Sequence, residues 1–283
     1  MSRYADLSLA VMALIWGAMF VVAKAALDDV SSVLYLALRF SLAAVVLGLI
    51  FGHKIRFHWA GVGLGVVLMG GYILQTVGLQ SISAAKNAFL TSGCIVGVPL
   101  LGWLVYRNQT RVVEVVGVLT AVTGMGLLSM QGGKLTIERG DALTLGCAAV
   151  YAVHIVLLGH LAPRIPYESL SFLQVAAAAG FAWIALPFVE TPAIRWTPAV
   201  ILAIVAGGLL ATALAFVLQT WAQQYTTPTR AALIFALEPV FAWFGAWWWN
   251  GEILTGRAAA GAALILAGVL LVELKPNRKT AHP

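Results

Sequence analysis

Ten long apolar runs, separated by short polar connections, dominate the pattern of hydrophobic and polar positions along the chain. Each run holds about 17–25 residues, the length that a helix needs to cross the hydrocarbon core of a bilayer. The pattern therefore predicts ten transmembrane helices. Their predicted limits are 7–26, 33–51, 60–80, 88–106, 112–130, 142–159, 168–189, 198–222, 231–249 and 258–274.

Composition excludes a soluble protein. Hydrophobic residues make up 61% of the 283 residues and charged residues only 10%, so one globule could not bury its apolar surface. The net charge of +6 does not indicate nucleic-acid binding, because the basic residues stand in ones and twos between apolar runs. We expect an all-α, multi-pass membrane protein whose partners are the lipid bilayer and a small-molecule substrate.

The basic residues of the connections predict the orientation. With the N-terminus in the cytoplasm, ten of them lie inside and five outside, as the positive-inside rule favours. Both termini are therefore expected in the cytoplasm. The inside set is Arg3, Lys54, Arg56, Arg107, Arg111, Arg164, Arg230, Lys275, Arg278 and Lys279, and the outside set is Lys86, Lys134, Arg139, Arg195 and Arg257.

An internal repeat divides the chain into two halves, 1–135 and 136–283. The triplet Leu-Gln-Thr occurs at 74–76 and again at 218–220, a shift of 144. The same shift matches Gln80 with Gln224, Lys86 with Arg230, Gly117 with Gly261 and Gly124 with Gly268; a shift of 135 matches Asp6 with Asp141, Trp16 with Tyr151 and Arg39 with Gln174. Five spans per half are an odd number, so the second repeat is predicted to be inverted, as in many secondary transporters.

Four stretches carry a resemblance to a known family. "IWGAMFVVAKAAL", "LRF", "LEPVFAWFGAWWWNGEILT" and "GAALILAGVLLVEL" resemble the EamA-type drug/metabolite transporters, most specifically in Glu238-Pro239-Val240 and Gly251-Glu252. The first half departs from that pattern, with Arg107-Asn108 at the place of Gly251-Glu252. Within the family, the chain is similar to YddG-type amino-acid exporters of bacterial inner membranes. The resemblance implies ten helices in two inverted repeats, and export from the cytoplasm.

Polar residues inside the spans predict a central cavity. At helical spacing they share faces, and such groups lack partners in lipid, so they are expected to point into the bundle. An apolar wall with uncharged hydrogen-bonding groups suits a small zwitterionic or amphipathic solute. The alternative is that they join helices to one another. The candidate substrate-binding residues are Trp16, Tyr72, Gln75, Asn87, Thr91, Tyr151, His154, Gln219 and Gln223.

Charged residues in or beside the spans are further candidates. Pro239 is expected to kink its helix near Phe235, and Glu238 either supports that kink or acts as a proton site facing the cavity. Arg39 and Lys24 are expected to reach the outer surface, with Asp28 and Asp29 as partners, and Arg39 is a possible functional cation. Lys86 and Arg230, each at the mouth of a helix, are either gate residues or ordinary interface anchors.

No motif of an enzyme is present. The sequence has no Walker A, HExxH or GxSxG pattern, and Cys94 and Cys147 lack metal-ligand spacing. We expect no cofactor, no metal and no ATPase subunit. The expected function is secondary active transport by alternating access. The expected substrates are neutral or aromatic amino acids, which the protein would export, and the alternative is export of other drugs or metabolites. A channel and an intramembrane enzyme are weaker alternatives.

Overall fold

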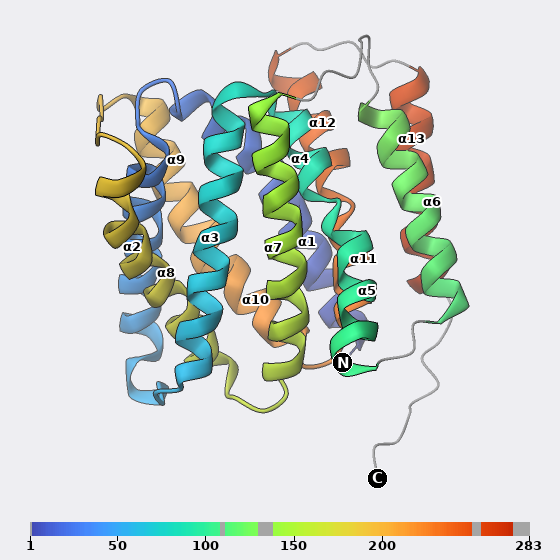
Figure 1. Cartoon of the computed structure of the whole chain (residues 1–283), viewed down its shortest axis with the longest axis horizontal. Coiled ribbons are helices and arrows are strands. Elements are labelled where there is room, and N and C mark those ends of the chain that lie inside the picture. The colour runs from blue at the N-terminus through green and yellow to red at the C-terminus, as the bar shows by residue number, and fades with distance from the viewer. Residues whose placement is uncertain (1, 108–110, 130–137, 251–255, 274–283) are drawn as a thin grey trace.

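The computed structural model describes residues 2–107, 111–129, 138–250 and 256–273. Within these ranges the chain is helical, with one isolated antiparallel bridge between Val30 and Ile194 and no strand. The helices stand side by side in a bundle (Figure 1). The first part contains α1 (Ser2–Ala26), α2 (Ser32–Phe51), the 3-10 turn η1 (Gly52–Lys54), α3 (Trp59–Ser81), α4 (Ala84–Thr91), α5 (Cys94–Tyr106) and α6 (Val112–Ser129).

The second part has a similar order of helices. It contains α7 (Arg139–Leu161), α8 (Tyr167–Val189), α9 (Pro198–Gly208), the π-helix η2 (Leu209–Leu214), α10 (Ala215–Ala222), α11 (Pro228–Phe235), α12 (Glu238–Asn250) and α13 (Gly256–Glu273). The predicted boundary between the halves, at 135 and 136, lies outside the described residues, as do Asn108 and Gly251-Glu252.

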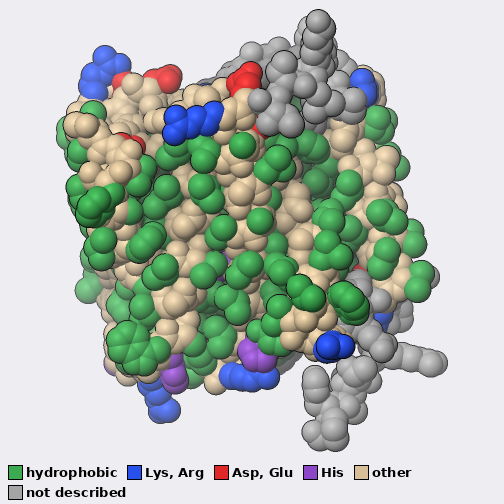
Figure 2. All heavy atoms as spheres, in the orientation of Figure 1, with side chains coloured by type: hydrophobic (Ala, Val, Ile, Leu, Met, Phe, Trp, Pro, Cys, Tyr) green, Lys and Arg blue, Asp and Glu red, His purple; other side chains and the backbone are tan. Residues whose placement is uncertain are grey.

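Helices occupy each of the ten predicted ranges. Seven helical stretches among the described residues are long and apolar enough to cross a membrane, and the shorter apolar helices Val112–Leu127 and Ala259–Val272 accompany them. On the face in Figure 2, hydrophobic side chains cover the middle of the bundle and charged side chains gather at its two ends. This surface fits a multi-pass membrane protein, since lipid meets an apolar belt between two wet ends.

Two of the predicted spans are broken within the bundle, and a third changes its helical pitch without a break. The fourth breaks at Ser92-Gly93, between α4 and α5, and the ninth breaks at Ala236-Leu237, between α11 and α12. The sequence predicts a kink near Phe235, and α11 ends at that residue. Pro239 lacks the backbone N–H that would continue the ladder of α11. The eighth span passes through the π-helix η2 without ending.

Glycines allow close contact between α6 and α13. A Cβ on Gly124 would lie 2.5 Å from the carbonyl oxygen of Gly261, and one on Gly117 would lie 2.9 Å from that of Gly268. Small residues at these points let the two backbones touch. The repeat shift of 144 matches Gly117 with Gly261 and Gly124 with Gly268. The shift therefore relates the contact between Gly124 and Gly261 to the contact between Gly117 and Gly268.

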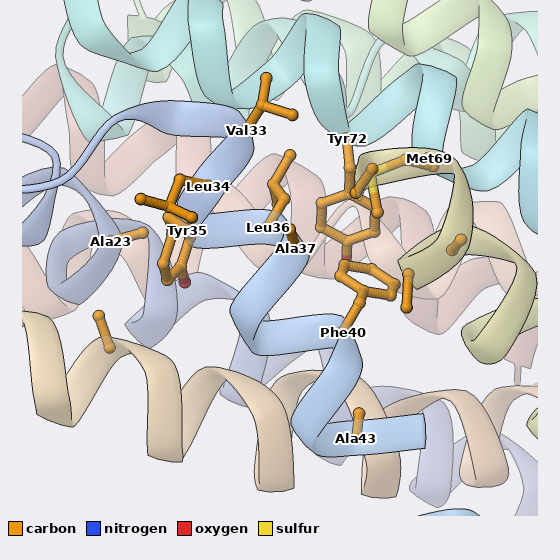
Figure 3. Packing of buried hydrophobic residues seen from close by; sticks show 14 of the residues in the cluster. Ala23, Val33, Leu34, Tyr35, Leu36, Ala37, Phe40, Ala43, Met69 and Tyr72 are labelled. Atoms are coloured by element: carbon orange, nitrogen blue, oxygen red, sulfur yellow. The ribbon is translucent and has the colours of Figure 1, made fainter. Parts of the chain in front are cut away.

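The core between α2, α3 and α8 positions one wall of the site. Figure 3 shows Phe40 of α2 pointing toward Tyr72 of α3. Their rings meet edge-on, with centroids 5.0 Å apart and an interplanar angle of 73°. Met69 and Ala37 are fully buried in the same cluster. This dense packing fixes the direction of Tyr72, whose side chain continues into the central cavity.

Candidate functional site

A cavity lies among helices of both halves of the bundle. Its empty space, open mouth included, is about 790 Å³. Residues from α1, α2, α3, α4, α5, α7, α10, α11 and α12 line it. Seven of the nine predicted substrate-binding residues lie in this wall: Trp16, Tyr72, Gln75, Thr91, Tyr151, His154 and Gln219.

Aromatic rings make up much of the wall. Trp16 packs against Phe216 and Phe235, with centroid distances of 5.9 and 5.3 Å. Tyr72 meets Tyr151 at 5.5 Å and Phe216 at 6.3 Å, both edge-on. Such contacts hold the rings in place and offer their faces and edges to an apolar or cationic group. Phe216 and Phe235, which were not among the predicted site residues, complete this aromatic wall.

The two matched glutamines face the cavity with different partners. Gln75 is held on both sides: the Tyr151 hydroxyl donates to its Oε1 at 3.1 Å, and its Nε2 donates to Thr91 Oγ1 at 3.1 Å. Gln219 donates from Nε2 to Gln223 Oε1 at 3.2 Å, whereas its buried Oε1 has no hydrogen-bond partner. An acceptor left unmet in a cavity wall is suited to a ligand donor.

Asn87 and Gln223 lie behind the wall rather than in it. Asn87 Nδ2 donates to the Gln75 carbonyl oxygen at 3.1 Å and to Thr144 Oγ1 at 3.0 Å. Gln223 Nε2 donates to the Ile155 carbonyl oxygen at 3.0 Å. The structure therefore corrects the prediction that these two residues line the cavity, because their amides join helices to one another.

His154 is held by a residue that the sequence did not single out. Its Nε2 lies 3.0 Å from Oε1 of Gln174, which is fully buried. Gln174 Nε2 donates in turn to Thr220 Oγ1 at 2.9 Å. This chain fixes the imidazole at the cavity wall. The only sequence signal for Gln174 was its match with Arg39 at the shift of 135.

Arg39 turns inward, contrary to the prediction that it reaches the outer surface. The residue is 5% exposed and lines the cavity. Its Nε donates to the Gly207 carbonyl oxygen at 3.1 Å and to Thr212 Oγ1 at 2.7 Å, and Nη2 donates to the Ala211 carbonyl oxygen at 3.0 Å. These acceptors belong to the π-helix η2 and to the residue two positions before it, and they hold the guanidinium inside the bundle.

Aromatic faces surround the same guanidinium. The Cζ atom of Arg39 lies 5.1 Å from the centroid of Tyr72, 5.6 Å from that of Phe40 and 5.9 Å from that of Tyr35. The indole Nε1 of Trp16 also donates to the Ala211 carbonyl oxygen, at 2.9 Å. Trp16 and Arg39 therefore both anchor η2 to the cavity wall.

The residues expected to pair with Arg39 and Lys24 have other roles. Asp29 accepts from Nε of Arg195 at 2.8 Å and from Thr197 Oγ1 at 3.0 Å. The Arg195 hydrogen bonds, and then that of Thr197, hold the pKa of the Asp29 carboxyl below its ordinary value of 3.8. Lys24 donates to the carbonyl oxygens of Leu79 and Gln80, at 2.7 and 2.8 Å, and joins α1 to the end of α3.

Glu238 is the first residue of α12 and faces the cavity. It is 6% exposed, and within the described part of the chain no hydrogen bond or ion pair engages its carboxyl group. The shift of 144 matches it with Cys94, the first residue of α5, which lines the same cavity. Pro239 follows directly in the first turn of α12 and does not line the cavity.

Lys86 and Arg230 form equivalent ion pairs between the halves. Lys86 Nζ lies 2.8 Å from Asp141 Oδ2, and Arg230 Nη2 lies 2.7 Å from Asp6 Oδ2. The two acids are themselves matched by the repeat, a signal that could have predicted both pairs. Figure 1 shows that α1 and α11 begin at the end of the bundle marked N, whereas α4 and α7 begin at the opposite end. The two pairs therefore lie at opposite ends of the bundle.

Comparisons with known proteins agree on the class of protein. Residues 3–130 and 138–274 each match the model of the EamA-like transporter family. An uncharacterized transporter of Archaeoglobus fulgidus is 36% identical over 275 residues, which cover 96% of this chain and 86% of that protein. The uncharacterized transporter YoaV of Bacillus subtilis is 24% identical over 94% of this chain and 95% of its own. A solved crystal structure has a TM-score of 0.80 at 21% identity and covers 95% of this chain and 96% of its own, which establishes the fold.

Proposed function

The chain belongs to the EamA-like transporter family, and we propose that it is a secondary carrier of amino acids that works by alternating access. It is a multi-pass membrane transporter and not an enzyme. The observation that carries the proposal is a cavity whose wall contains both members of matched pairs. Trp16 and Tyr151 are one such pair, and Gln75 and Gln219 are another. A site shared by two halves is what an exchange of their conformations would expose to either side.

The chemistry of the wall supports a small amphipathic solute. Aromatic rings offer an apolar surface to a side chain, and the amides of Gln75 and Gln219 can donate or accept hydrogen bonds. Neutral and aromatic amino acids combine these two properties. Other small metabolites of the same shape are the alternative within the family.

The two ion pairs support two gates. Asp6–Arg230 joins α1 to α11 at one end, and Lys86–Asp141 joins α4 to α7 at the other. Because the repeat relates the pairs, an exchange of conformations between ten helices in two inverted halves would open one while the other stays closed. We assign the end with Asp6–Arg230 to the cytoplasm of a bacterial-type cell, with both termini on that side.

The cavity extends toward the end opposite the N-terminus. Its wall includes Ala23, Tyr35 and Leu79, which lie two or three residues from the ends of α1, α2 and α3 on that side. In the other direction Leu9 and Met12 of α1 are fully buried in the core. Because both ion pairs are formed, this asymmetry supports a closed conformation of an exporter, in which the solute lies nearer the outer end and would leave toward it.

Counterflow in liposomes tests the proposal. Purified full-length protein is reconstituted into vesicles loaded with an unlabelled amino acid, and the uptake of the same labelled amino acid is followed over time. A carrier gives a transient overshoot that saturates with concentration. Non-saturating flux without an overshoot would indicate a channel and would overturn the proposal.

A further inference from the structure

We propose that Arg39 binds the carboxylate of the transported solute and that Glu238 faces its ammonium group, so that the cavity accepts a zwitterion in one orientation. The inference rests on the proposed carrier function and names the two charged contacts of the same site. Both residues line the cavity, both are buried, and the ion pairs of the described residues include neither of them.

Arg39 has the hydrogen-bonding capacity that a carboxylate requires. A guanidinium carries five N–H groups, and its four hydrogen bonds use one on Nε, one on Nη1 and one on Nη2. Each terminal nitrogen therefore keeps one N–H. Two N–H groups on neighbouring nitrogens can meet both oxygens of a carboxylate. The acceptors already present are all neutral, so the positive charge of Arg39 is left for a ligand to balance.

Glu238 has the complementary capacity. Its carboxyl group reaches the cavity without a protein donor, whereas every other buried acid among the described residues, Asp6 and Asp141, forms an ion pair. Trp16 and Phe235 belong to the same wall, and their rings pack together at 5.3 Å. A carboxylate beside aromatic faces is a favourable place for an ammonium group.

In the repeat, each of these two charged residues is matched with an uncharged residue in the other half. The position matched with Arg39 is Gln174, and the position matched with Glu238 is Cys94. Among the described residues that line the cavity, the first half thus supplies one charged residue, the cation on α2, and the second half supplies one acid, on α12. A cavity of two similar halves would accept a solute in either direction. One cation and one acid on different halves give it a single preferred direction for a dipolar solute.

The test uses four compounds with one phenyl group and different charges. L-phenylalanine carries both charges, phenylalaninamide and phenethylamine lack the carboxylate, and 3-phenylpropionate lacks the ammonium group. Binding to the full-length protein in lipid nanodiscs is measured by quenching of tryptophan fluorescence, and exchange is measured by counterflow. We expect phenylalanine to bind at least tenfold more tightly than each of the other three.

Variants of Arg39 and Glu238 test which residue contacts the carboxylate and which contacts the ammonium group of the solute. Arg39→Gln should reduce the preference for phenylalanine over phenethylamine at least tenfold, and Glu238→Gln should reduce its preference over 3-phenylpropionate to a similar extent. Thr212→Val is the matched control for Arg39, because it removes one hydrogen bond from the guanidinium and keeps the charge. Cys94→Ser is the control for Glu238, because it changes the matched neutral position. Each control keeps both charges of the site, so each should change the preferences by threefold at most.

The outcomes separate the inference from the proposed function. Phenylalaninamide or phenethylamine that binds and exchanges within threefold of phenylalanine leaves the carrier intact and overturns the inference. Absence of counterflow for every amino acid overturns the proposed function and the inference together. Should Arg39→Gln fail to fold because η2 loses its anchor, the wild-type panel and Glu238→Gln still decide, since no group among the described residues is hydrogen-bonded to the Glu238 carboxyl.

Discussion

The two ion pairs between the halves differ in burial, and this difference predicts unequal gates. The side chains of Arg230 and Asp6 are 11% and 8% exposed, whereas those of Lys86 and Asp141 are 38% and 5% exposed. Removing one partner of a buried pair would leave an isolated charge, so the double variant Asp6→Asn with Arg230→Gln is the cleaner perturbation. The matched control is Asp141→Asn with Lys86→Gln.

The magnitudes follow from burial. A hydrogen bond between buried charged groups contributes about 1.5–3 kcal/mol, and a partly exposed pair contributes about 0.2–1 kcal/mol. If the Asp6–Arg230 pair exists only while its end is closed, its loss shifts the balance of conformations by roughly 10- to 150-fold, at about 1.4 kcal/mol per factor of ten. Loss of the Lys86–Asp141 pair shifts it the other way by about fivefold or less.

Cys94 provides the assay. It lines the cavity, and Cys147→Ala leaves it as the only thiol in the chain. A charged, membrane-impermeant thiol reagent is added either outside or inside sealed vesicles of known protein orientation, and the labelling rates are compared. We expect the buried-pair variant to increase labelling from the cytoplasmic side and the control to increase it slightly from the outer side. Labelling rates that stay the same from both sides in both variants would refute the gate assignment.

Three further predictions concern the cavity wall, the kink and the loop after α1. Gln219→Leu should weaken substrate affinity by about 1–3 kcal/mol with little change in thermal stability, whereas Gln75→Leu should also lower the melting temperature, because it leaves the Tyr151 hydroxyl without its acceptor; saturation uptake and thermal unfolding separate the two effects. Glu238→Gln should abolish any response of transport to a pH gradient, and Pro239→Ala should slow exchange more than it weakens binding; an unchanged pH response in vesicles would favour a purely structural glutamate. Asp29→Asn should lower the melting temperature at neutral pH, and the parent and variant should converge as pH falls through 3.8 and below, because a lowered carboxyl pKa stabilises the fold only while the group is ionised.

Helix limits were predictable because the bilayer demands long apolar runs. The predicted ranges 33–51 and 168–189 agree within one residue with α2 and α8. The break at Ser92-Gly93 was not predicted, since no proline marks it, whereas Pro239 marked the break in the ninth span. Seven helical stretches among the described residues have the length and hydropathy of a membrane helix. The full count of ten spans and the inversion of the repeat therefore stay predictions.

The site was predictable only as far as helical periodicity reaches. Periodicity tells which face of a helix turns inward, and it identified Gln75, Thr91 and His154 as inward-facing. It cannot tell whether an inward group meets the cavity or a neighbouring helix, and Asn87 and Gln223 meet helices. Three of the four hydrogen-bond partners of Arg39 lie about 170 positions away in the chain, so local sequence suggested the nearer Asp29 instead.

The π-helix η2 sets the rotation of α10 relative to α9 within the eighth span. A π turn contains about one residue more than an α turn, and each residue of an α-helix corresponds to a rotation of about 100°. Converting Leu209–Leu214 to α-helical hydrogen bonding would therefore turn α10 relative to α9 by about that angle, and Phe216 and Gln219 with it. Arg39 and Trp16 hold the present setting through the Ala211 carbonyl oxygen. A solute held by the two remaining N–H groups of Arg39 would bind the same guanidinium that holds η2, so an occupied cavity would act on the rotation of its own wall.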